Sequence, residues 1–212
     1  MTDEVRLTVV LATRNEHKVA EIVDAFALPG ITFESLAGRD GVPEVVEDGD
    51  TLEANARKKA REVCDATGMP ALADDSGLLV DALGGAPGVH SARFAGEGGD
   101  DAANRALLLE RLAGVPDEER TAHFACVLAL CVPTGEECII HGECHGRILH
   151  AERGDGGFGY DALFLAQGQR RTFAEIPLGE KAELSHRGRA LAQARRPMGR
   201  MLREWAVRWG GA

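Results

Sequence analysis

The sequence has no apolar run long enough to cross a lipid bilayer and no apolar signal segment. A disulfide framework is not expected either, because the five cysteines are an odd number in a chain without a signal segment, which favours a reducing compartment. Internal repeats, low-complexity tracts and clear linkers are missing as well. We therefore expect a cytoplasmic protein with no membrane partner.

Basic residues are outnumbered, since 24 lysines and arginines face 34 aspartates and glutamates and the net charge is −10. This balance argues against a protein that coats nucleic acid or an anionic membrane, so we expect no nucleic-acid partner. An anionic substrate must then be held by a local group of donors. The 212 residues are enough to bury a full core, and we predict one two-lobed domain over residues 1–212.

Two adjacent aspartates, Asp74 and Asp75, stand between apolar runs at residues 71–73 and 78–83. We predict that these runs are two short buried strands and that residues 76–77 form a turn between them. Adjacent strand residues point to opposite faces, so one aspartate can face a cleft while the other holds backbone or a supporting group. Mg²⁺ prefers carboxylate oxygens together with substrate phosphates, so we predict a magnesium phosphate site. The alternative is a solvated turn.

An almost continuous apolar run, residues 5–12, predicts a strand buried on both faces. Apolar residues at helical spacing follow over residues 19–26, so the polar residues 13–18 predict a turn into a helix N-terminus. Free backbone N–H groups and the helix dipole favour a bound phosphate there. The donor side chains are Thr13, Arg14, Asn15 and Lys18. The alternative is that Thr13 or Asn15 caps the helix while the basic residues are solvated.

An acidic, irregular segment, residues 43–50, precedes a predicted helix over residues 52–68. Asp50 and Glu53 fit a capping box at the start of this helix. From a loop, Glu47 can reach a metal at the aspartate pair as a second carboxylate. The alternative is an ordinary acidic loop.

The remaining predicted elements are architectural. Apolar patterns and turn residues predict a strand over residues 31–36, a helix over 102–113, and strands over 121–132 and 138–149 joined by a turn at 133–137. A last helix passes through Leu191, and we expect Pro197 to kink or break it.

Four soft metal ligands lie on the second hairpin strand: Cys138, His141, Cys144 and His145. In an extended strand, Cys144 and His145 point to opposite faces and cannot converge on one tetrahedral centre. We therefore expect buried thiols and a partly exposed histidine here, and no zinc.

A glycine-rich loop, residues 153–164, carries the aromatic residues Phe158 and Tyr160. Glycine permits close backbone approach, and the two rings can form a stacking wall for a flat base. Such a contact is worth about 1–3 kcal/mol per base in single-strand binders. The alternative is a packed aromatic turn.

A basic cluster precedes the last helix and contains Lys181, Ser185, His186, Arg187 and Arg189. Cations at a helix start are unfavourable for the helix dipole. An anion or carbonyl partner is therefore predicted for Lys181, His186 and Arg187. The alternative is a basic helix that is merely solvated.

Four segments together resemble one family, the inosine triphosphate pyrophosphatases, which remove noncanonical purine nucleotides. The segments are Leu11-Ala12-Thr13-Arg14-Asn15-Glu16-His17-Lys18, Ala73-Asp74-Asp75-Ser76-Gly77-Leu78 with Gly84-Gly85-Ala86-Pro87-Gly88, Gly157-Phe158-Gly159-Tyr160-Asp161, and Ser185-His186-Arg187-Gly188-Arg189-Ala190-Leu191. They occur in the family order, and the resemblance extends from Leu7 to about Arg195.

The resemblance implies an elongated mixed α/β fold, in which a β-sheet is flanked by helices and two lobes enclose a central cleft, with Mg²⁺ as cofactor and a homodimer as the assembly. Asp75 would be a Mg²⁺ ligand and the catalytic base, Glu47 a second ligand, and Ser76 a substrate contact. The triphosphate would be bound by Thr13, Arg14, Asn15, Glu16, His17 and Lys18. The nucleoside would be held by Phe158, Gly159, Tyr160, Asp161, Lys181, His186 and Arg187.

The implied reaction is hydrolysis of a purine nucleoside triphosphate, such as ITP, dITP or XTP, to the monophosphate and pyrophosphate. Mg²⁺ would neutralise phosphate charge and position water for attack on the α-phosphorus. Arg187 donates hydrogen bonds and accepts none, so it would favour a 6-oxo purine over adenine with its 6-amino group.

Three positions depart from the family pattern: Ala162 stands where proline is usual, Ala54 where an acidic residue is common, and His145 where an aromatic residue is commoner. Two other functions stay open. One is a Maf-type nucleotide pyrophosphatase, although its N-terminal Ser-Pro-Arg loop is missing here. The other is a non-catalytic nucleotide sensor or RNA-binding module that uses the same residues.

Overall fold

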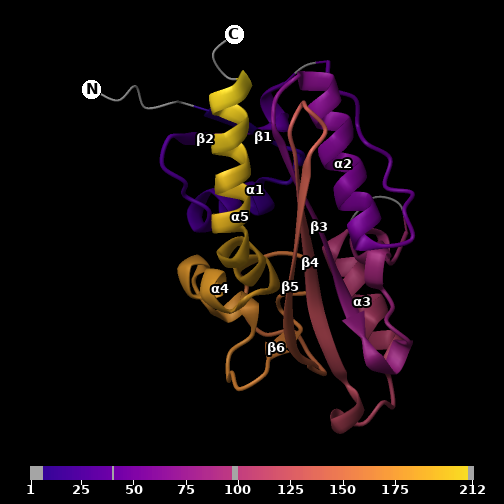
Figure 1. Cartoon of the computed structure of the whole chain (residues 1–212). Helices are drawn as coiled ribbons and strands as arrows, with labels where there is room; N and C mark the ends of the chain where they lie inside the picture. Colours follow the sequence, from indigo (N-terminus) through magenta and orange to yellow (C-terminus); the bar gives the residue numbers. More distant parts are fainter. Residues whose placement is uncertain (1–6, 40, 97–99, 210–212) are drawn as a thin grey trace. The chain divides into compact units, whose positions relative to one another are not determined.

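The computed structural model describes residues 7–39, 41–96 and 100–209. The strands in this part are β1 (Leu7–Leu11), β2 (Ile31–Ser35), β3 (Ala71–Val80), β4 (Thr121–Cys131), β5 (Glu137–Ile148) and β6 (Phe164–Ala166). They form a six-stranded sheet in the order β2-β1-β3-β4-β5-β6 (Figure 1). β1 is parallel to β2 and β3, whereas β5 and β6 are antiparallel, so the sheet is mixed as predicted.

Helices flank the sheet, which confirms the predicted α/β class (Figure 1). The α-helices are α1 (Glu16–Ala25), α2 (Leu52–Thr67), α3 (Asp101–Arg111), α4 (Leu178–Leu184) and α5 (His186–Trp209). Short 3-10 helices lie at Leu36–Gly38, Asp81–Leu83, Gly88–Arg93, Asp117–Glu119 and Phe173–Glu175. Among the described residues, no helix is long and apolar enough to cross a membrane.

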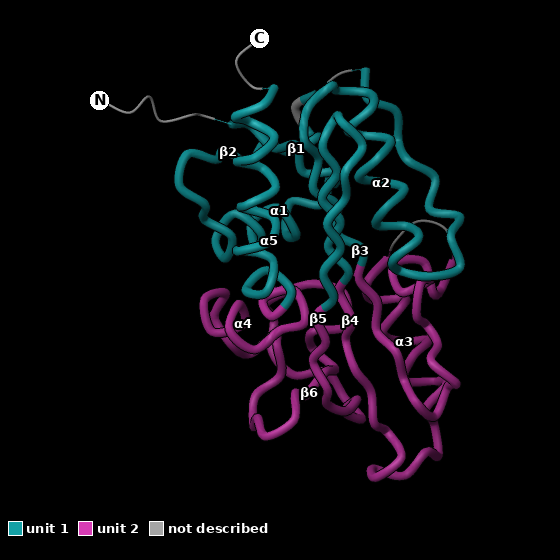
Figure 2. The backbone as a smooth tube through the Cα atoms, viewed as in Figure 1, with its two compact units in different colours: residues 1–75, 127–141, 190–212 teal, residues 76–126, 142–189 magenta. Residues whose placement is uncertain are grey.

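The chain divides into two compact units (Figure 2). Unit 1 contains residues 1–75, 127–141 and 190–212, and unit 2 contains residues 76–126 and 142–189. Neither unit is a continuous piece of chain, because β3, β4 and β5 each begin in one unit and end in the other. The single two-lobed domain with a central cleft stays a prediction.

In unit 1 the end of β1 and the start of β3 are buried on both faces. Val10, Ala71 and Ala73 share a core with apolar residues of α2, and the alternate residues Val9 and Leu72 are also fully buried. Figure 1 shows α2 on one side of these strands and α1 with α5 on the other. The apolar run that predicted the first strand therefore reflects helices on both faces. Its residues 5 and 6 lie outside the described part of the chain.

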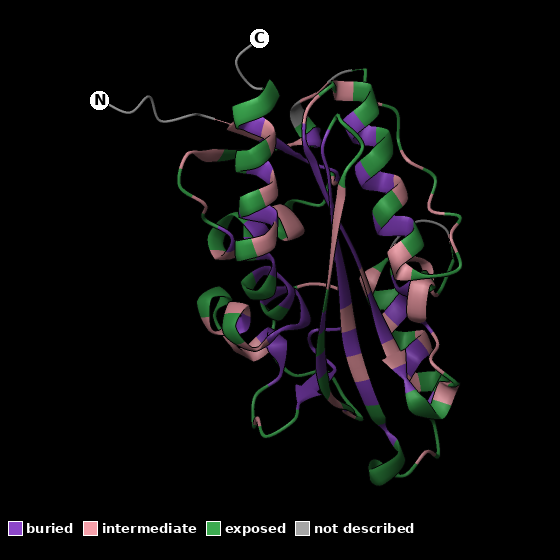
Figure 3. Cartoon of the chain, in the orientation of Figure 1, coloured by how far each residue is buried: buried purple, intermediate pink, exposed green. Residues whose placement is uncertain are grey.

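Unit 2 has its own core, formed by α3 and the unit 2 portions of β3 to β6. Aromatic rings fill its centre: the ring centroids of Phe124 and Phe164 are 4.7 Å apart in an edge-to-face contact, and Phe173 lies 5.2 Å from Phe164. Figure 3 shows the alternation of buried and partly exposed residues along β4 that accompanies this packing.

One prediction in the central stretch is wrong, because β3 is a single strand over residues 71–80 with no turn at Gly77. A Cβ at residue 77 would collide with the carbonyl oxygen of Gly88. The segment packed there is tied to β3 by Ser91, whose Oγ accepts a hydrogen bond from the backbone N–H of Leu78 at 2.9 Å. Gly77 thus serves close backbone approach, and Leu83 lies in a 3-10 helix beyond the strand.

The capping prediction for α2 is wrong, and of the kink or break expected at Pro197 the break does not occur. The cap of α2 is Thr51, whose Oγ1 accepts from the backbone N–H of Ala54 at 3.1 Å, and no Asp50 capping box forms. α5 continues through Pro197 and is not broken there. Ala194 and Met198 on either side are fully buried, so packing of this helix outweighs the hydrogen bond that proline removes.

Candidate functional site

The polar residues after β1 form the predicted turn into α1. Asn15 caps the helix, since its Oδ1 accepts from the backbone N–H of Lys18 at 3.1 Å, and Thr13 Oγ1 accepts from the backbone N–H of Asn15 at 3.1 Å. Residues 14–17 are exposed at this helix start. Arg14 donates to the carbonyl of Val42 at 2.9 Å. The capping alternative is therefore correct for Asn15, and it leaves the helix N-terminus open to solvent and to an anion.

Asp74 is held by α1. It is 1% exposed, and its Oδ1 lies 2.6 Å from Nζ of Lys18. Asp74 lies two residues after Leu72 on β3, so its side chain is on the same side of the sheet as that of Leu72. Lys18, predicted to bind phosphate, is thus tied to a buried carboxylate while 17% of its side chain stays exposed.

Asp75 is held by α2 instead. Its Oδ1 accepts from Nζ of Lys59 at 2.8 Å, and the same ammonium donates to Glu47 Oε1 at 2.8 Å and to the carbonyl of Asp74 at 2.9 Å. The two aspartates therefore face opposite sides of β3, as the alternation of strand side chains predicted, while the difference in their roles stays a prediction.

The other carboxylate oxygen of Asp75 has no hydrogen-bond partner within the described part of the chain, although it is buried. Asp75 as a whole is only 6% exposed. A buried acceptor without a donor is costly, so this oxygen is available to a group from outside the protein, such as a cation.

Burial raises the pKa of Asp75, and this effect outweighs the nearby ammonium groups of Lys59 and Lys18. Burial alone would lower the pKa of Lys59, but Asp75 and Glu47 outweigh it and raise that pKa. Lys59 is therefore an ammonium ion at neutral pH, set between two carboxyl groups.

The segment that carries Glu47 is fastened to α2 through the two residues that follow it. Lys58 pairs with Asp48 at 2.6 Å, and Asn55 Oδ1 accepts from the backbone N–H of Gly49 at 2.8 Å. A Cβ at Gly49 would meet Asn55 Oδ1 at 2.7 Å, so glycine is needed for this approach. These contacts bring the predicted second carboxylate to within reach of the same lysine as Asp75.

These oxygen atoms fit a hard divalent cation such as Mg²⁺. The open oxygen of Asp75 and the carboxylate of Glu47 are both of the ligand type that Mg²⁺ prefers. In the described residues, no three His, Cys, Asp or Glu side chains converge as a metal cage. Mg²⁺ does not require one, because it commonly binds through one or two carboxylates, waters and substrate phosphates.

Lys59 was not among the residues that the sequence singled out for function. One signal was available: it is a charged residue in the apolar stripe of α2, between Ala56 and Ala60, which are both buried. A lysine on the buried side of a helix needs a partner, and here the partners are Asp75 and Glu47.

A second group of predicted residues comes together in unit 2. Arg187 is 1% exposed and donates from Nη2 to Ser76 Oγ at 3.2 Å, while its guanidinium lies 5.7 Å from the ring centroid of Phe158. Lys181 lies 4.8 Å from the same centroid and pairs with Asp161 at 2.5 Å. The ring of Phe158 therefore has two cations within cation–π range.

The glycine-rich loop that carries Phe158 and Asp161 is held in this arrangement by contacts of its own residues and of α3. Gly157 has φ +70°, and a Cβ there would collide with the carboxylate of Asp161. That carboxylate also accepts from the backbone N–H of Phe158 at 3.0 Å. Gly159 is fixed from α3, since its N–H donates to Asp101 at 2.6 Å and its carbonyl accepts from Arg105 at 2.9 Å.

The expected stacking role of Tyr160 is wrong for its side chain. Tyr160 is 3% exposed, belongs to the unit 2 core and donates its hydroxyl to the carbonyl of Ser91 at 2.8 Å. Burial raises its pKa, as expected of a phenol with little access to water. The alternative of a packed aromatic turn is correct for this residue.

Lys181, His186 and Arg187 are not solvated, so that alternative for the basic cluster is wrong. Lys181 has the predicted anionic partner in Asp161, and it lies in α4. His186 is buried and stacks on Phe124 with centroids 4.7 Å apart.

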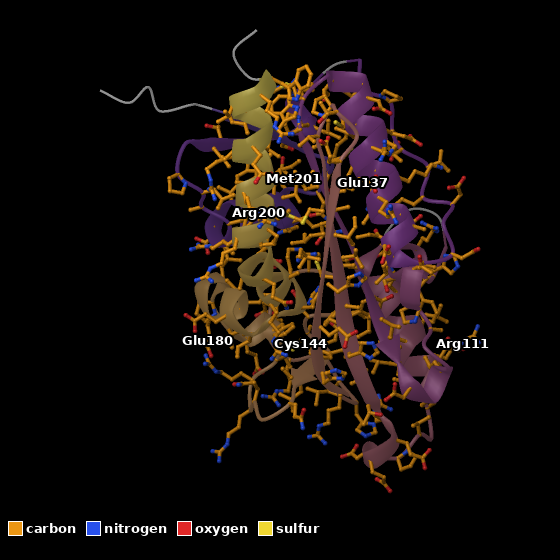
Figure 4. All side chains as sticks on the ribbon, viewed as in Figure 1. Arg111, Glu137, Cys144, Glu180, Arg200 and Met201 are labelled. Carbon is orange, nitrogen blue, oxygen red and sulfur yellow. The ribbon has the colours of Figure 1, made fainter. Side chains whose placement is uncertain are left out.

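The four soft ligands of β5 have separate surroundings. Cys144, labelled in Figure 4, is buried in the unit 2 core, whereas His145 is exposed and lies 3.4 Å from Glu143. His141 Nε2 lies 3.1 Å from Glu53 Oε2. The absence of zinc stays a prediction, which elemental analysis of the purified protein checks.

Comparison with known proteins identifies the family. The model of the Ham1 family matches residues 9–196. This chain belongs to the Ham1 family. The match covers all four segments that carried the resemblance to the inosine triphosphate pyrophosphatases, and that resemblance is confirmed.

Relatives within the family are close over most of their length. A Geobacter sulfurreducens protein named dITP/XTP pyrophosphatase is 55% identical over 86% of this chain and 92% of its own. A Lactiplantibacillus plantarum protein of the same name is 50% identical over 88% and 92%. The solved structure of a HAM1 protein from Coxiella burnetii matches with a TM-score of 0.82 at 41% identity, covering 93% of this chain and 99% of the other.

Proposed function

We propose that this protein hydrolyses noncanonical purine nucleoside triphosphates, namely ITP, dITP and XTP, to the monophosphate and pyrophosphate with Mg²⁺ as cofactor. The observation that carries the proposal is the open, buried oxygen of Asp75 beside Lys59 and Glu47. Family relatives named dITP/XTP pyrophosphatase support the substrate class and the bond that is broken. Such an enzyme removes these nucleotides from the cellular pool.

The triphosphate belongs at residues 13–18. The N-terminus of α1 offers backbone N–H groups and the positive end of a helix dipole, and Lys18 adds an ammonium group with part of its surface exposed. Asp74 fixes the direction of Lys18, so the ammonium is already placed before phosphate arrives. Thr13, Arg14, Asn15, Glu16 and His17 line the same exposed turn.

Asp75 and Glu47 are the proposed Mg²⁺ ligands. When bound there, Mg²⁺ supplies neutralisation of phosphate charge and orientation of water. Asp75 also serves as the base that takes the proton of the attacking water, and burial helps because it raises the pKa of this carboxyl group. The pyrophosphate leaves after attack at the α-phosphorus.

The nucleoside is assigned to residues of unit 2. Ser76 follows Asp75 directly on β3, and its hydroxyl accepts a hydrogen bond from Arg187. Arg187 can donate to a 6-oxo group and cannot accept from a 6-amino group. Phe158 offers a ring face, while Gly159, Tyr160 and Asp161 shape the loop and Lys181 and His186 support it.

The direct test is incubation of the protein with ITP, dITP, XTP, GTP and ATP, each with and without Mg²⁺. The expected result is Mg²⁺-dependent formation of monophosphate and pyrophosphate from the first three. Diphosphate with inorganic phosphate would contradict cleavage at the α-phosphorus. Preference for other bases would point to Maf-type specificity, and nucleotide binding without turnover would point to a sensor.

A homodimer and a cytoplasmic location complete the proposal. The homodimer follows from the family resemblance, and the cytoplasmic location follows from the odd number of cysteines and the lack of an apolar signal segment. Sedimentation equilibrium of the purified protein should give twice the chain mass of 22.6 kDa. A monomer over the micromolar range would contradict the dimer.

A further inference from the structure

Glu47 and Asp75, called here the acidic pair, are bridged by one ammonium group. Lys59 Nζ lies 2.8 Å from an oxygen of each carboxylate. Its remaining hydrogen bond goes to the carbonyl of Asp74 at 2.9 Å. The three N–H donors of the ammonium are thus matched by three acceptors, so the cation is fixed in direction.

Burial strengthens the electrostatic effect of the Lys59 ammonium. Only 9% of the Lys59 side chain and 8% of the Asp75 side chain are exposed, so water screens the ammonium weakly. Lys59 occupies one oxygen of Asp75, and the other oxygen stays open in the described part of the chain. A divalent cation at that open oxygen would therefore lie next to an ammonium ion and would be repelled by it.

We propose, resting on the metal ligands of the proposed function, that Lys59 is a built-in competitor that keeps the affinity of the acidic pair for free Mg²⁺ low. With Lys59 present, the two carboxylates and the ammonium carry a net charge of −1. The negative charge that completes a strong site for a divalent cation then comes from the triphosphate. Mg²⁺ accordingly binds tightly together with the nucleotide and weakly without it.

Two substitutions in α2 separate this role from a general charge effect. Lys59→Met removes the ammonium and keeps an unbranched side chain of similar length. Arg61→Met removes the same charge two residues later, where the arginine pairs with Glu137 at 2.6 Å rather than with the segment that carries Glu47. Both variants change the net charge of the protein by the same amount.

The measurement is calorimetric titration of substrate-free protein with Mg²⁺ at pH 8, supported by counting free Mn²⁺ by electron paramagnetic resonance. Lys59→Met should bind either metal at least tenfold more tightly than wild type, while Arg61→Met should stay within about twofold. Equal or weaker binding by Lys59→Met would overturn the proposal. An equal gain in both variants would also overturn it, because only net charge would then matter.

Loss of a buried cation can destabilise the substrate-free variant. The melting temperature is therefore measured against Mg²⁺ concentration, since a ligand at free concentration L that binds only the native state stabilises it by RT ln(1 + L/Kd), which rises with log L in proportion to occupancy. The melting temperature of Lys59→Met should rise more for each tenfold increase in Mg²⁺ concentration than that of wild type. A smaller rise would count against the proposal. These measurements need no substrate, so their outcome does not depend on whether the protein hydrolyses ITP.

Discussion

Asp74 and Asp75 are consecutive residues of β3, yet their carboxylates are paired with lysines of two different helices. Asp74 is bound by Lys18 of α1 at 2.6 Å, and Asp75 by Lys59 of α2 at 2.8 Å. The alternation of side chains along a strand produces this separation. It gives the two carboxyl groups different surroundings and, we predict, different roles.

Asp75→Asn should fold normally and bind nucleotide, but Mg²⁺-dependent hydrolysis should fall by roughly a hundredfold or more, since both a metal ligand and the base are lost. Steady-state kinetics at saturating Mg²⁺ with ITP measures this loss. Asp24→Asn, which changes an exposed carboxylate of α1, is the control and should retain activity. Turnover of Asp75→Asn near the wild-type value would remove Asp75 from the chemistry.

Asp74→Asn should mainly reduce stability. The substitution leaves Lys18 without its buried carboxylate, at a cost of about 1–3 kcal/mol. For a chain of this size, each kcal/mol corresponds to about 2–4 °C in melting temperature. Thermal unfolding followed by circular dichroism checks the shift. An unchanged melting temperature with activity as low as in Asp75→Asn would contradict the separation of roles.

Arg187→Ala should lower kcat/KM for ITP much more than for ATP. The ratio of kcat/KM for ITP to kcat/KM for ATP should therefore fall by about tenfold. The reason is that Arg187 can only donate, and an unmatched buried group costs about 1–3 kcal/mol. Arg189→Ala is the control, because Arg189 is exposed and donates to the carbonyl of Glu143. An unchanged ITP-to-ATP ratio in Arg187→Ala would leave Arg187 with a phosphate-binding or structural role.

Arg120→Met should destabilise the protein by about 2–4 kcal/mol. The Arg120 guanidinium is buried and donates to the carbonyls of Leu112, Ile148 and Leu149 at 2.8–2.9 Å, which lose their donors in the variant. Urea unfolding measures the loss. Arg111→Met on the exposed surface of α3, labelled in Figure 4, should change stability by less than about 0.5 kcal/mol. Equal effects would contradict the role of the buried hydrogen bonds.

Cys138 should be the first thiol to react with iodoacetamide in the native protein at pH 8. It is the partly exposed member of the five cysteines, and the others are buried. Burial raises the pKa of Cys64 to about 12, so the reactive thiolate of that residue is scarce. Mass spectrometry of peptides after short labelling identifies the modified residue. Faster labelling of Cys64 than of Cys138 would contradict the described burial.

Local sequence predicted the elements that depend on neighbours along the chain. The turn into α1 and the end of α2 at Gly68, which has φ +65°, follow from residues within a few positions of each other. The division between Asp74 and Asp75 likewise needed only the twofold alternation of a strand. The four motifs, taken together, were enough to indicate the family.

Tertiary structure decided the roles that depend on residues distant in sequence. Gly77 was mistaken for a turn residue because its real neighbour, the carbonyl of Gly88, is invisible to a local pattern. The burial of Tyr160 likewise depends on Ser91.

Lys59 meets Asp75 from 16 positions away, and Arg187 meets Ser76 from 111 positions away. Hydrophobic periodicity reports which face of an element is buried, but the partner of a buried charge is set by how the elements pack. For that reason the sequence by itself identified the carboxylates, whereas only the fold revealed the lysine between them.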